Sequence, residues 1–386
     1  MVQQNIKKNS TLKKVGIISY HAVPNYGAVL QTFALYKTLE NLGVKPYIIN
    51  RQATKVYFGK RASFVRYYLL KTLPLSLFRK LNKLVLPKHV SNFYNKYLNS
   101  VSKPFFSDES LCKYNFDLDY IIAGCDQIWN FHMAEEHSEH LSFNFFLNFI
   151  KKPNIKKLSY AASFGKNYWD NDINEETKYI KDLINKFSHI SVRETSGVKL
   201  CKEIFNVEAC CVLDPTLLLD GDFYSSHLNI DDISYPKDGV VFFKFCQDPK
   251  FFESVKVLAS NSEENFYIIN SEENSEYYYN IQGPSFEEWL SAIKHSKLVV
   301  TDSFHGMAFA IIFRRPFVVL NWIPERIIRQ LDLMDRLNIK NRFADYDLLI
   351  NNFNEYLNMD YSTVEDYLKK EQDSSLCFLK KALGTS

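Results

Sequence analysis

Short apolar runs alternate along this chain with longer segments in which apolar residues recur at helical spacing. The short runs are typical of strands buried on both faces of a sheet, and the longer segments of helices that cover it. Because the order strand, helix, strand recurs from residue 14 onward, the pattern predicts α/β structure with parallel sheets. The predicted strands are residues 14–20, 45–50, 120–124, 158–165, 189–194, 211–216, 240–245, 266–269, 297–301 and 317–320. The predicted helices are residues 29–42, 175–187, 195–205, 285–295 and 362–383.

The length of 386 residues exceeds what one hydrophobic core usually supports, which predicts two domains. Aspartate, serine, glycine and proline cluster at residues 220–238 and mark the boundary. We expect two Rossmann-like, doubly wound domains that face a cleft. They are residues 1–225, with a basic helical insertion at about 51–107, and residues 226–386, with a terminal helix at about 362–383. In the second domain, residues 345–350 are predicted to form a short strand or turn, and Ser362 with Glu365 has the spacing of a capping box.

The formal net charge of +3 conceals one strongly basic segment. No acidic residue lies between Glu40 and Asp108, whereas thirteen lysines and arginines do, and residues 61–88 interleave them with leucine, tyrosine and phenylalanine. This mixture suits an anionic membrane surface as a partner. It equally suits a helical insertion that packs its apolar face on the core and leaves its lysines solvated. No nucleic-acid-binding motif accompanies the charge, so no nucleic-acid partner is expected.

The remaining composition indicates where the protein works. No run approaches the ~20 apolar residues that cross a bilayer, and residues 1–14 are polar and basic without the apolar core of a signal peptide. The seven cysteines form no CxxC pair, and their odd number argues against a disulfide framework. We expect a cytoplasmic, reduced protein, peripheral at the inner face of the membrane if the basic segment binds lipid.

Five polar residues stand directly after predicted strands, namely Asn25, Asp126, Ser163, Arg193 and His305. Because doubly wound domains bind ligands beyond the carboxyl ends of their strands, we expect these side chains to converge in the cleft. His305 lies where a loop becomes an apolar helix, whose first turn carries unbonded N–H groups and the positive end of the helix dipole. An imidazole beside such an anion site is suited to acid–base chemistry, although a structural helix-cap histidine fits the same pattern.

Two further features are interpreted as structural. Three histidines and three glutamates crowd residues 132–140, but they match no zinc motif, so we expect no metal and interpret them as a mobile polar loop near the cleft. Asp214 precedes Pro215 and is interpreted as a turn residue.

Six short motifs stand in an order that resembles the polysaccharide pyruvyl transferase family. They are Asn25-Tyr26-Gly27-Ala28, Gly124-Cys125-Asp126-Gln127-Ile128-Trp129-Asn130, Ser159-Tyr160-Ala161-Ala162-Ser163-Phe164-Gly165, Ser191-Val192-Arg193-Glu194, Val212-Leu213-Asp214-Pro215-Thr216 and Asp302-Ser303-Phe304-His305-Gly306. The resemblance covers about residues 14–340 and implies a GT-B-like fold. It also implies transfer of the pyruvate group of phosphoenolpyruvate onto two hydroxyls of one sugar in a polysaccharide precursor, which yields a cyclic ketal and phosphate. Phosphoenolpyruvate is then a donor substrate, and the reaction requires no cofactor or metal.

The resemblance also assigns roles to residues of the cleft. His305 matches the catalytic histidine and is the candidate donor of a proton to the methylene carbon of phosphoenolpyruvate. Arg193 matches the arginine that binds this donor, although an ion pair with a nearby acid such as Glu194 is the alternative. The start of the predicted helix, at Ser303, Phe304 and the amide of Gly306, would hold the phosphate.

This chain departs from the family pattern in two places. Characterised members often have an Arg-Leu-His triplet where this chain has Ser303, Phe304 and His305, so one expected cation is absent. Lys244 and Arg326 are the candidates to replace that cation, and each is equally well interpreted as a solvated charge. The basic segment is the second departure, since it is not part of the shared motifs.

The acceptor side of the cleft is predicted from the remaining loop residues. Asp126 is a candidate to orient or deprotonate an acceptor hydroxyl, with a loop-stabilising role as the alternative. Asn25, Gln127 and Ser163 are candidates to hydrogen-bond the sugar. The expected acceptor is a glycan, and we expect its carrier to be a lipid at the inner membrane face.

Two other classes of function stay open at this point. A GT-B glycosyltransferase that uses a nucleotide sugar is the alternative enzyme, since that fold more often hosts this activity. A catalytically inactive relative that binds glycans or acts as a membrane-associated scaffold is the alternative without chemistry, and the absent triplet arginine keeps it in view.

Overall fold

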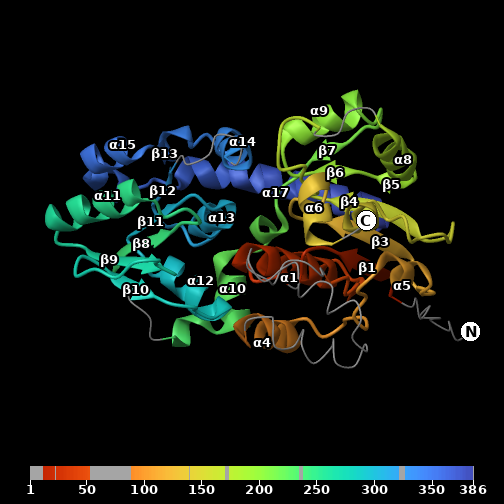
Figure 1. Cartoon of the computed structure of the whole chain (residues 1–386), viewed down its shortest axis with the longest axis horizontal. Coiled ribbons are helices and arrows are strands. Elements are labelled where there is room, and N and C mark those ends of the chain that lie inside the picture. Colours follow the sequence, from red (N-terminus) through yellow and green to blue (C-terminus); the bar gives the residue numbers. More distant parts are fainter. Residues whose placement is uncertain are drawn as a thin grey trace, which may run out of the picture.

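Two parallel β-sheets form the centre of the molecule (Figure 1). The computed structural model describes residues 12–21, 23–52, 88–138, 140–169, 174–233, 238–320 and 327–385. The first sheet has the order β2-β1-β3-β4-β5, and a short pair, β6-β7, continues beside it. Its strands are β1 (Lys14–Ile18), β2 (Lys45–Ile48), β3 (Tyr120–Gly124), β4 (Lys156–Tyr160), β5 (Phe187–His189), β6 (Ser191–Val192) and β7 (Cys210–Cys211).

The second sheet has six strands in the order β10-β9-β8-β11-β12-β13, and every pairing in it is parallel. Its strands are β8 (Gly239–Phe243), β9 (Asn265–Ile269), β10 (Tyr279–Ile281), β11 (Leu298–Thr301), β12 (Phe317–Leu320) and β13 (Phe343–Ala344). All residues of β8, β11 and β12 are buried, as expected for strands covered by helices on both faces. The prediction of parallel α/β sheets is therefore confirmed.

Helices cover both sheets and connect their strands. Those of the first half are α1 (Tyr26–Asn41), α4 (Lys88–Tyr97), α5 (Asp108–Cys112), α6 (Phe131–His137), α7 (Leu141–Phe145), α8 (Glu175–Ile184), α9 (Thr195–Glu203) and the 3₁₀ helix η1 (Pro215–Leu218). Those of the second half are α10 (Gly221–Leu228), η2 (Ile230–Asp232), α11 (Pro249–Ser260), α12 (Phe286–Lys294), α13 (Phe304–Ile312), α14 (Ile328–Arg336), η3 (Lys340–Arg342), α15 (Tyr346–Asn351), α16 (Phe353–Tyr356) and α17 (Ser362–Leu383). Within the described ranges, no helix has the length and apolar character needed to cross a membrane.

Four local predictions differ from the structure. The predicted strand at 211–216 is replaced by the short β7, which ends at Cys211, and by η1, which begins at Pro215. The predicted strand at 189–194 is divided, because β5 pairs with β4 and β6 pairs with β7. Residues 346–350, predicted with Asp345 as a strand or turn, lie in helix α15, since the Asp345 side chain caps that helix by accepting from the Leu348 amide. The capping box at Ser362 is also wrong: Ser362 is the first helical residue, and its amide and hydroxyl both donate to Asp360.

The last helix, α17, packs against elements of the first half of the chain, and Figure 1 shows it running across the molecule. The Leu213 amide donates to the Ser375 hydroxyl at 2.9 Å, and the Gln372 side chain donates to the Leu217 carbonyl at 2.7 Å. At the far end of α17, the Lys13 ammonium donates to the Leu383 carbonyl at 2.7 Å. These contacts join the two halves behind the cleft.

The basic segment is described only at its edges, because residues 53–87 lie outside the described ranges. On its far side, α4 packs between the halves: Phe93 contacts Phe33 of α1, with ring centroids 5.6 Å apart, and Phe286 of α12, with centroids 4.4 Å apart. On its near side, the buried Arg51 donates to Asn144 at 2.8 Å. These described edges of the segment belong to the core, while the membrane-binding prediction concerns residues outside the description.

Candidate functional site

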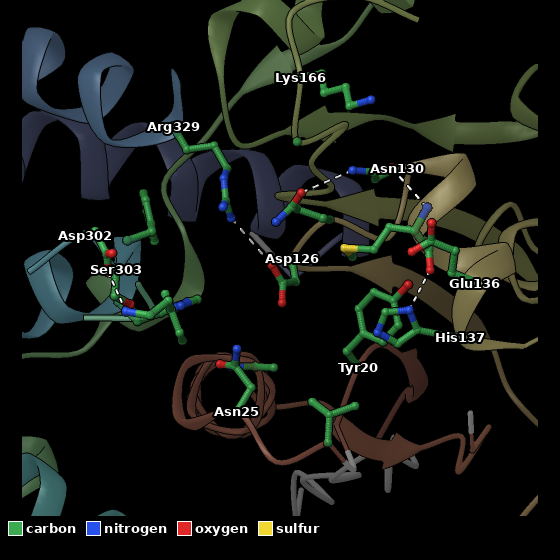
Figure 2. Close-up of a pocket in the computed structure, with 18 of the residues that line it drawn as sticks. Tyr20, Asn25, Asp126, Asn130, Glu136, His137, Lys166, Asp302, Ser303 and Arg329 are labelled. Atoms are coloured by element: carbon green, nitrogen blue, oxygen red, sulfur yellow. Dashed lines mark hydrogen bonds and ion pairs between the residues drawn. The ribbon is translucent and has the colours of Figure 1, made fainter. Parts of the chain in front are cut away.

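A cavity of about 630 Å³ lies between the carboxyl ends of the two sheets (Figure 2). The loops after β1, β3 and β4 line it on one side, and the loops after β8 and β11, with helix α14, line it on the other. This is the position at which doubly wound folds bind ligands, because loops from several parallel strands converge there. Six residues of the predicted site line the cavity, namely Asn25, Asp126, Gln127, Ser303, Phe304 and His305.

Two helices, α1 and α13, begin at the cavity wall. Asn25 caps α1, its side-chain oxygen accepting from the Ala28 amide at 3.1 Å. Ser303 caps α13 in the same way, accepting from the Gly306 amide at 3.3 Å. Both caps line the cavity, so the positive ends of both helix dipoles face its interior and favour a bound anion.

The turn that carries the histidine motif is held by Thr301. Its hydroxyl donates to the Phe243 carbonyl at 2.6 Å and accepts from the Ser303 amide at 2.9 Å. Gly306 is required here because a Cβ at this position would lie 2.5 Å from the Thr301 hydroxyl. The Gly306 amide already donates to Ser303, so the close packing of α13 on β11 is the role that the geometry gives to Gly306.

His305 lies in the cavity wall with a largely buried ring, 6% exposed. Its Nε2 is 3.5 Å from an Asp214 carboxylate oxygen and has no hydrogen-bond partner among the described residues. On the opposite side the ring rests on α1: a Cβ added to Gly27 would lie 1.9 Å from His305 Nδ1. The absence of a side chain at Gly27 therefore makes the space that the imidazole occupies.

Asp214 is more than the turn residue that its place before Pro215 suggests. One carboxylate oxygen does accept from the Thr216 amide and hydroxyl, which starts η1. The other accepts from the Arg193 guanidinium at 2.7 Å and faces His305. Burial by itself would raise the pKa of Asp214, but His305 and Arg193 hold that pKa well below its usual range. The carboxylate is therefore a fixed negative charge behind the histidine.

Arg193 lies behind the cavity wall rather than on it. Its side chain is 2% exposed, its guanidinium carbon lies 4.6 Å from the centre of the Phe304 ring, and it does not line the cavity. Its NH2 is 3.6 Å from Asp126, and within the described ranges Nε and NH2 have no hydrogen-bond partner. The ion pair that was the alternative for Arg193 is thus present, with Asp214 at hydrogen-bond distance and Asp126 further away.

Glu194, the neighbour of Arg193 in the sequence, has a different set of contacts. Its carboxylate accepts from the Ser163 hydroxyl at 2.9 Å and from the Phe164 amide at 3.0 Å. Burial raises the pKa of Glu194 above its usual value. Ser163 is fully buried and does not line the cavity, so its hydroxyl orders the loop after β4 instead of facing a ligand.

Asp126 lines the cavity in a left-handed backbone conformation, with φ at +64°. Such a conformation is uncommon outside glycine and often marks a functional loop. Burial alone would raise the pKa of Asp126, yet Arg193, His305 and Arg329 together lower it. Asp126 is therefore a carboxylate held close to three basic groups.

The structure adds an arginine that the sequence interpretation missed. Arg329, at the start of α14, lines the cavity and points toward Asp126, with its NH1 3.8 Å from the carboxylate (Figure 2). Burial and the neighbouring charge of Arg193 lower the pKa of Arg329 to about 10. Only its position after an apolar run could have indicated a site, since no motif surrounds it.

The two cations proposed to replace the absent triplet arginine are placed differently. The Lys244 side chain is buried and lies 3.4 Å from Asp302, which also accepts from the Phe245 and Cys246 amides. Lys244 does not line the cavity. Arg326 lies outside the described residues.

The histidine- and glutamate-rich segment at 132–140 is not simply a loop, which corrects its interpretation. Residues Phe131–His137 form helix α6, because the Asn130 side chain caps it by accepting from the Met133 amide. His132, Glu136 and His137 line the end of the cavity away from His305, and Figure 2 shows the latter two beside Tyr20. This face of α6 forms one wall of the cavity.

A cavity between two parallel α/β sheets, with helix N-termini and basic side chains around it, is the architecture of a GT-B-like protein. The sequence profile of the polysaccharide pyruvyl transferases matches residues 25–324, and the chain belongs to that family. A search among curated proteins gave no match.

Solved structures support the same fold. The chain is similar to a putative UDP-N-acetylglucosamine 2-epimerase from Listeria monocytogenes, with TM-score 0.55, 10% identity and 96% of each chain covered. It is also similar to S. aureus MnaA in a structure with UDP, with TM-score 0.53, 10% identity, and 97% of this chain and 98% of that chain covered. A glycosyltransferase from Rickettsia africae gives TM-score 0.50 at 10% identity, with 96% and 94% covered. These likenesses confirm the GT-B-like fold and establish the fold alone.

Proposed function

We propose that the protein is a ketal-forming pyruvyl transferase that moves the pyruvate group of phosphoenolpyruvate onto two hydroxyls of one sugar. Membership of the family supports the donor and the class of acceptor. The observation that carries the proposal is the His305 ring, set in the cavity wall between Gly27 and the Asp214 carboxylate. A titratable ring held beside an anion-binding surface is what proton transfer to an anionic substrate requires.

The reaction begins with a proton. Phosphoenolpyruvate becomes electrophilic at C2 when its methylene carbon, C3, is protonated. His305 would supply this proton through Nδ1, because Nε2 faces Asp214. Asp214 keeps the ring oriented and stabilises its cationic form, as a carboxylate does for a histidine in a hydrolase triad.

Two hydroxyls of the acceptor then replace the phosphate. The first attacks C2 and forms one C–O bond, the C2–O bond to phosphate breaks, and the second hydroxyl closes the ring. One hydroxyl proton replaces the proton given by His305, and the other leaves with the phosphate, so the protons balance. The positive ends of α1 and α13 stabilise the departing phosphate.

The acceptor would occupy the half of the cavity between the loop after β1 and helix α6. Asp126, Asn25 and Gln127 line the junction between this half and His305. Asp126 accepts a hydrogen bond from an attacking hydroxyl, and the two amides orient the sugar. We expect the glycan to be attached to a lipid, which gives the basic segment a role at the inner membrane face.

The test is phosphate release from phosphoenolpyruvate in the presence of a panel of lipid-linked glycans. Wild-type protein should release phosphate only with an acceptor, and His305→Ala should lose this release. His227→Ala is a matched control, since His227 lies on α10 and stacks on Phe223 away from the cavity. Release that survives His305→Ala would contradict the assigned proton donor. No release with any acceptor, together with tight binding of a nucleotide sugar, would contradict the proposed function itself.

A further inference from the structure

One cavity-lining arginine has no assigned role in the reaction. Of the described residues that line the cavity, arginine occurs once, as Arg329. Its side chain is 13% exposed, and its Nε is buried without a hydrogen-bond partner in the described ranges. Arg329 is therefore a largely desolvated cation that faces the space where a ligand would lie.

Among the described residues, no carboxylate lies within hydrogen-bond distance of Arg329. A single Asp126 oxygen, Oδ1, is 3.8 Å from Arg329 and 3.6 Å from Arg193, and both distances exceed that of a good hydrogen bond. Arg193 is also 2.7 Å from Asp214 and lies against the Phe304 ring. Arg329, within the described residues, forms an ion pair only with Asp126, at the longer distance. A guanidinium without a close carboxylate is disposed to bind an external anion, which it can contact through two N–H groups.

Helix α14 holds Arg329 in this position from both sides of the cleft. The next residue, Gln330, donates to the Asp302 carbonyl at 3.0 Å, directly before the capping Ser303. One turn later, Asp332 accepts from the Thr195 amide at 2.9 Å, and at the end of the helix Arg336 donates to the Arg193 carbonyl at 3.3 Å. Arg329 is thus placed by bonds to the two loops that carry Ser303 and Arg193.

We propose that Arg329 is a donor-binding residue, whose guanidinium binds an anionic group of phosphoenolpyruvate in place of the arginine that Ser303 replaces. This inference rests on the proposed function for the identity of the donor. The donor anion would contact the Arg329 guanidinium on the side that faces the Asp126 carboxylate, which is 3.8 Å away in the free protein. Arg193, behind the Phe304 ring, then acts through Asp214 and Asp126 as a positioning residue.

The test compares Arg329→Gln with Arg314→Gln, a control at an exposed arginine that pairs with Glu365. We expect Arg329→Gln to raise the Kd for phosphoenolpyruvate roughly 10- to 100-fold, the range for one lost hydrogen bond to a charged group. The control should leave it unchanged. Inorganic phosphate and pyruvate, used as competing ligands, identify the group that Arg329 contacts: the one whose affinity falls in Arg329→Gln is its partner.

Two outcomes separate this inference from the function on which it rests. Wild-type protein that neither binds phosphoenolpyruvate nor releases phosphate from it would overturn the proposed function. Wild-type protein that does both, beside an Arg329→Gln variant with unchanged Kd and KM, would overturn the role of Arg329 alone. If Arg329→Gln fails to fold, Arg329→Lys provides the test, because lysine keeps the charge and loses the two-pronged contact. An unchanged Kd in that variant would also overturn the inference.

Discussion

Replacing Gly27 with alanine tests how closely helix α1 approaches the proposed proton donor. A Cβ at this position would lie 1.9 Å from Nδ1 of His305 and 2.3 Å from its Cγ. Ordinary van der Waals contact begins near 3.4 Å, so the ring would have to retreat by roughly 1.5 Å. Gly27 lies in the first turn of α1, where an alanine backbone is allowed, and the steric contact is therefore the main effect.

The expected magnitudes follow from these distances. A displacement of about 1 Å at a reacting group can cost on the order of 100-fold in rate, so kcat of Gly27→Ala should fall by at least that factor. Overpacking typically costs about 1–3 kcal/mol of unfolding free energy. Alanine in a helix recovers about 0.5–1 kcal/mol relative to glycine, so the net destabilisation should be modest.

A double-mutant cycle with His305→Ala separates the two contributions without any substrate. In the His305→Ala background the ring is absent, so Gly27→Ala should no longer destabilise and should add a few tenths of a kcal/mol or more through helix propensity. Urea unfolding of the four proteins measures the coupling directly. If Gly27→Ala changed stability equally in both backgrounds and left kcat intact, the close contact between α1 and the ring would be refuted.

Three other perturbations have defined outcomes. Asp214→Asn should lower the unfolding free energy by about 3–5 kcal/mol, because it leaves a buried arginine without its close carboxylate. The pKa of Asp214 is depressed in the folded state, so the unfolding free energy of the wild-type protein, measured in urea, should decrease as pH falls below about 4. The variant should show a smaller decrease over the same pH range. Burial lowers the pKa of Lys157 to about 8, below its unfolded value, so stability should rise with pH from about 8 to 10.5, and Lys157→Met should reduce that rise; an unchanged slope would contradict the assignment. The protein should co-sediment with anionic vesicles at low salt and detach at high salt, and Lys80→Glu with Lys83→Glu should weaken the binding. Equal binding to neutral vesicles, indifferent to salt, would argue against an electrostatic membrane contact.

The sheets were predictable because their strands are buried on both faces. Runs such as residues 317–320 and 240–243 have no polar position. Such a run indicates a buried strand whatever the arrangement of the neighbouring helices. The divided strand around Ile190 was not predictable, because nothing local distinguishes a strand that pairs with β4 from one that pairs with β7. Helix α15 was missed because it is only six residues long, too short to show helical periodicity, and its start depends on the Asp345 cap.

The site was partly predictable for a related reason. Asn25, Asp126 and His305 follow strands, and the parallel topology brings such residues to the same edge of their sheets. The roles of Gly27 and Arg329 depend instead on how the two halves of the chain meet. Gly27 contacts His305 and Arg329 faces Asp126, and each of these partners comes from the opposite half. Contacts of this kind leave no periodicity or spacing in the sequence.

Formation of the ketal is the central claim, and the fate of the donor carbon atoms in deuterated water tests it most directly. Phosphoenolpyruvate labelled with ¹³C at C2 is incubated with wild-type protein and an acceptor glycan, and the product is examined by NMR and mass spectrometry. The label is expected at a ketal carbon of the glycan, with one deuterium in the adjoining methyl group and one phosphate released per label transferred. Label that stays in phosphoenolpyruvate while the protein transfers a sugar from a nucleotide, or a product methyl group without deuterium, would contradict this claim.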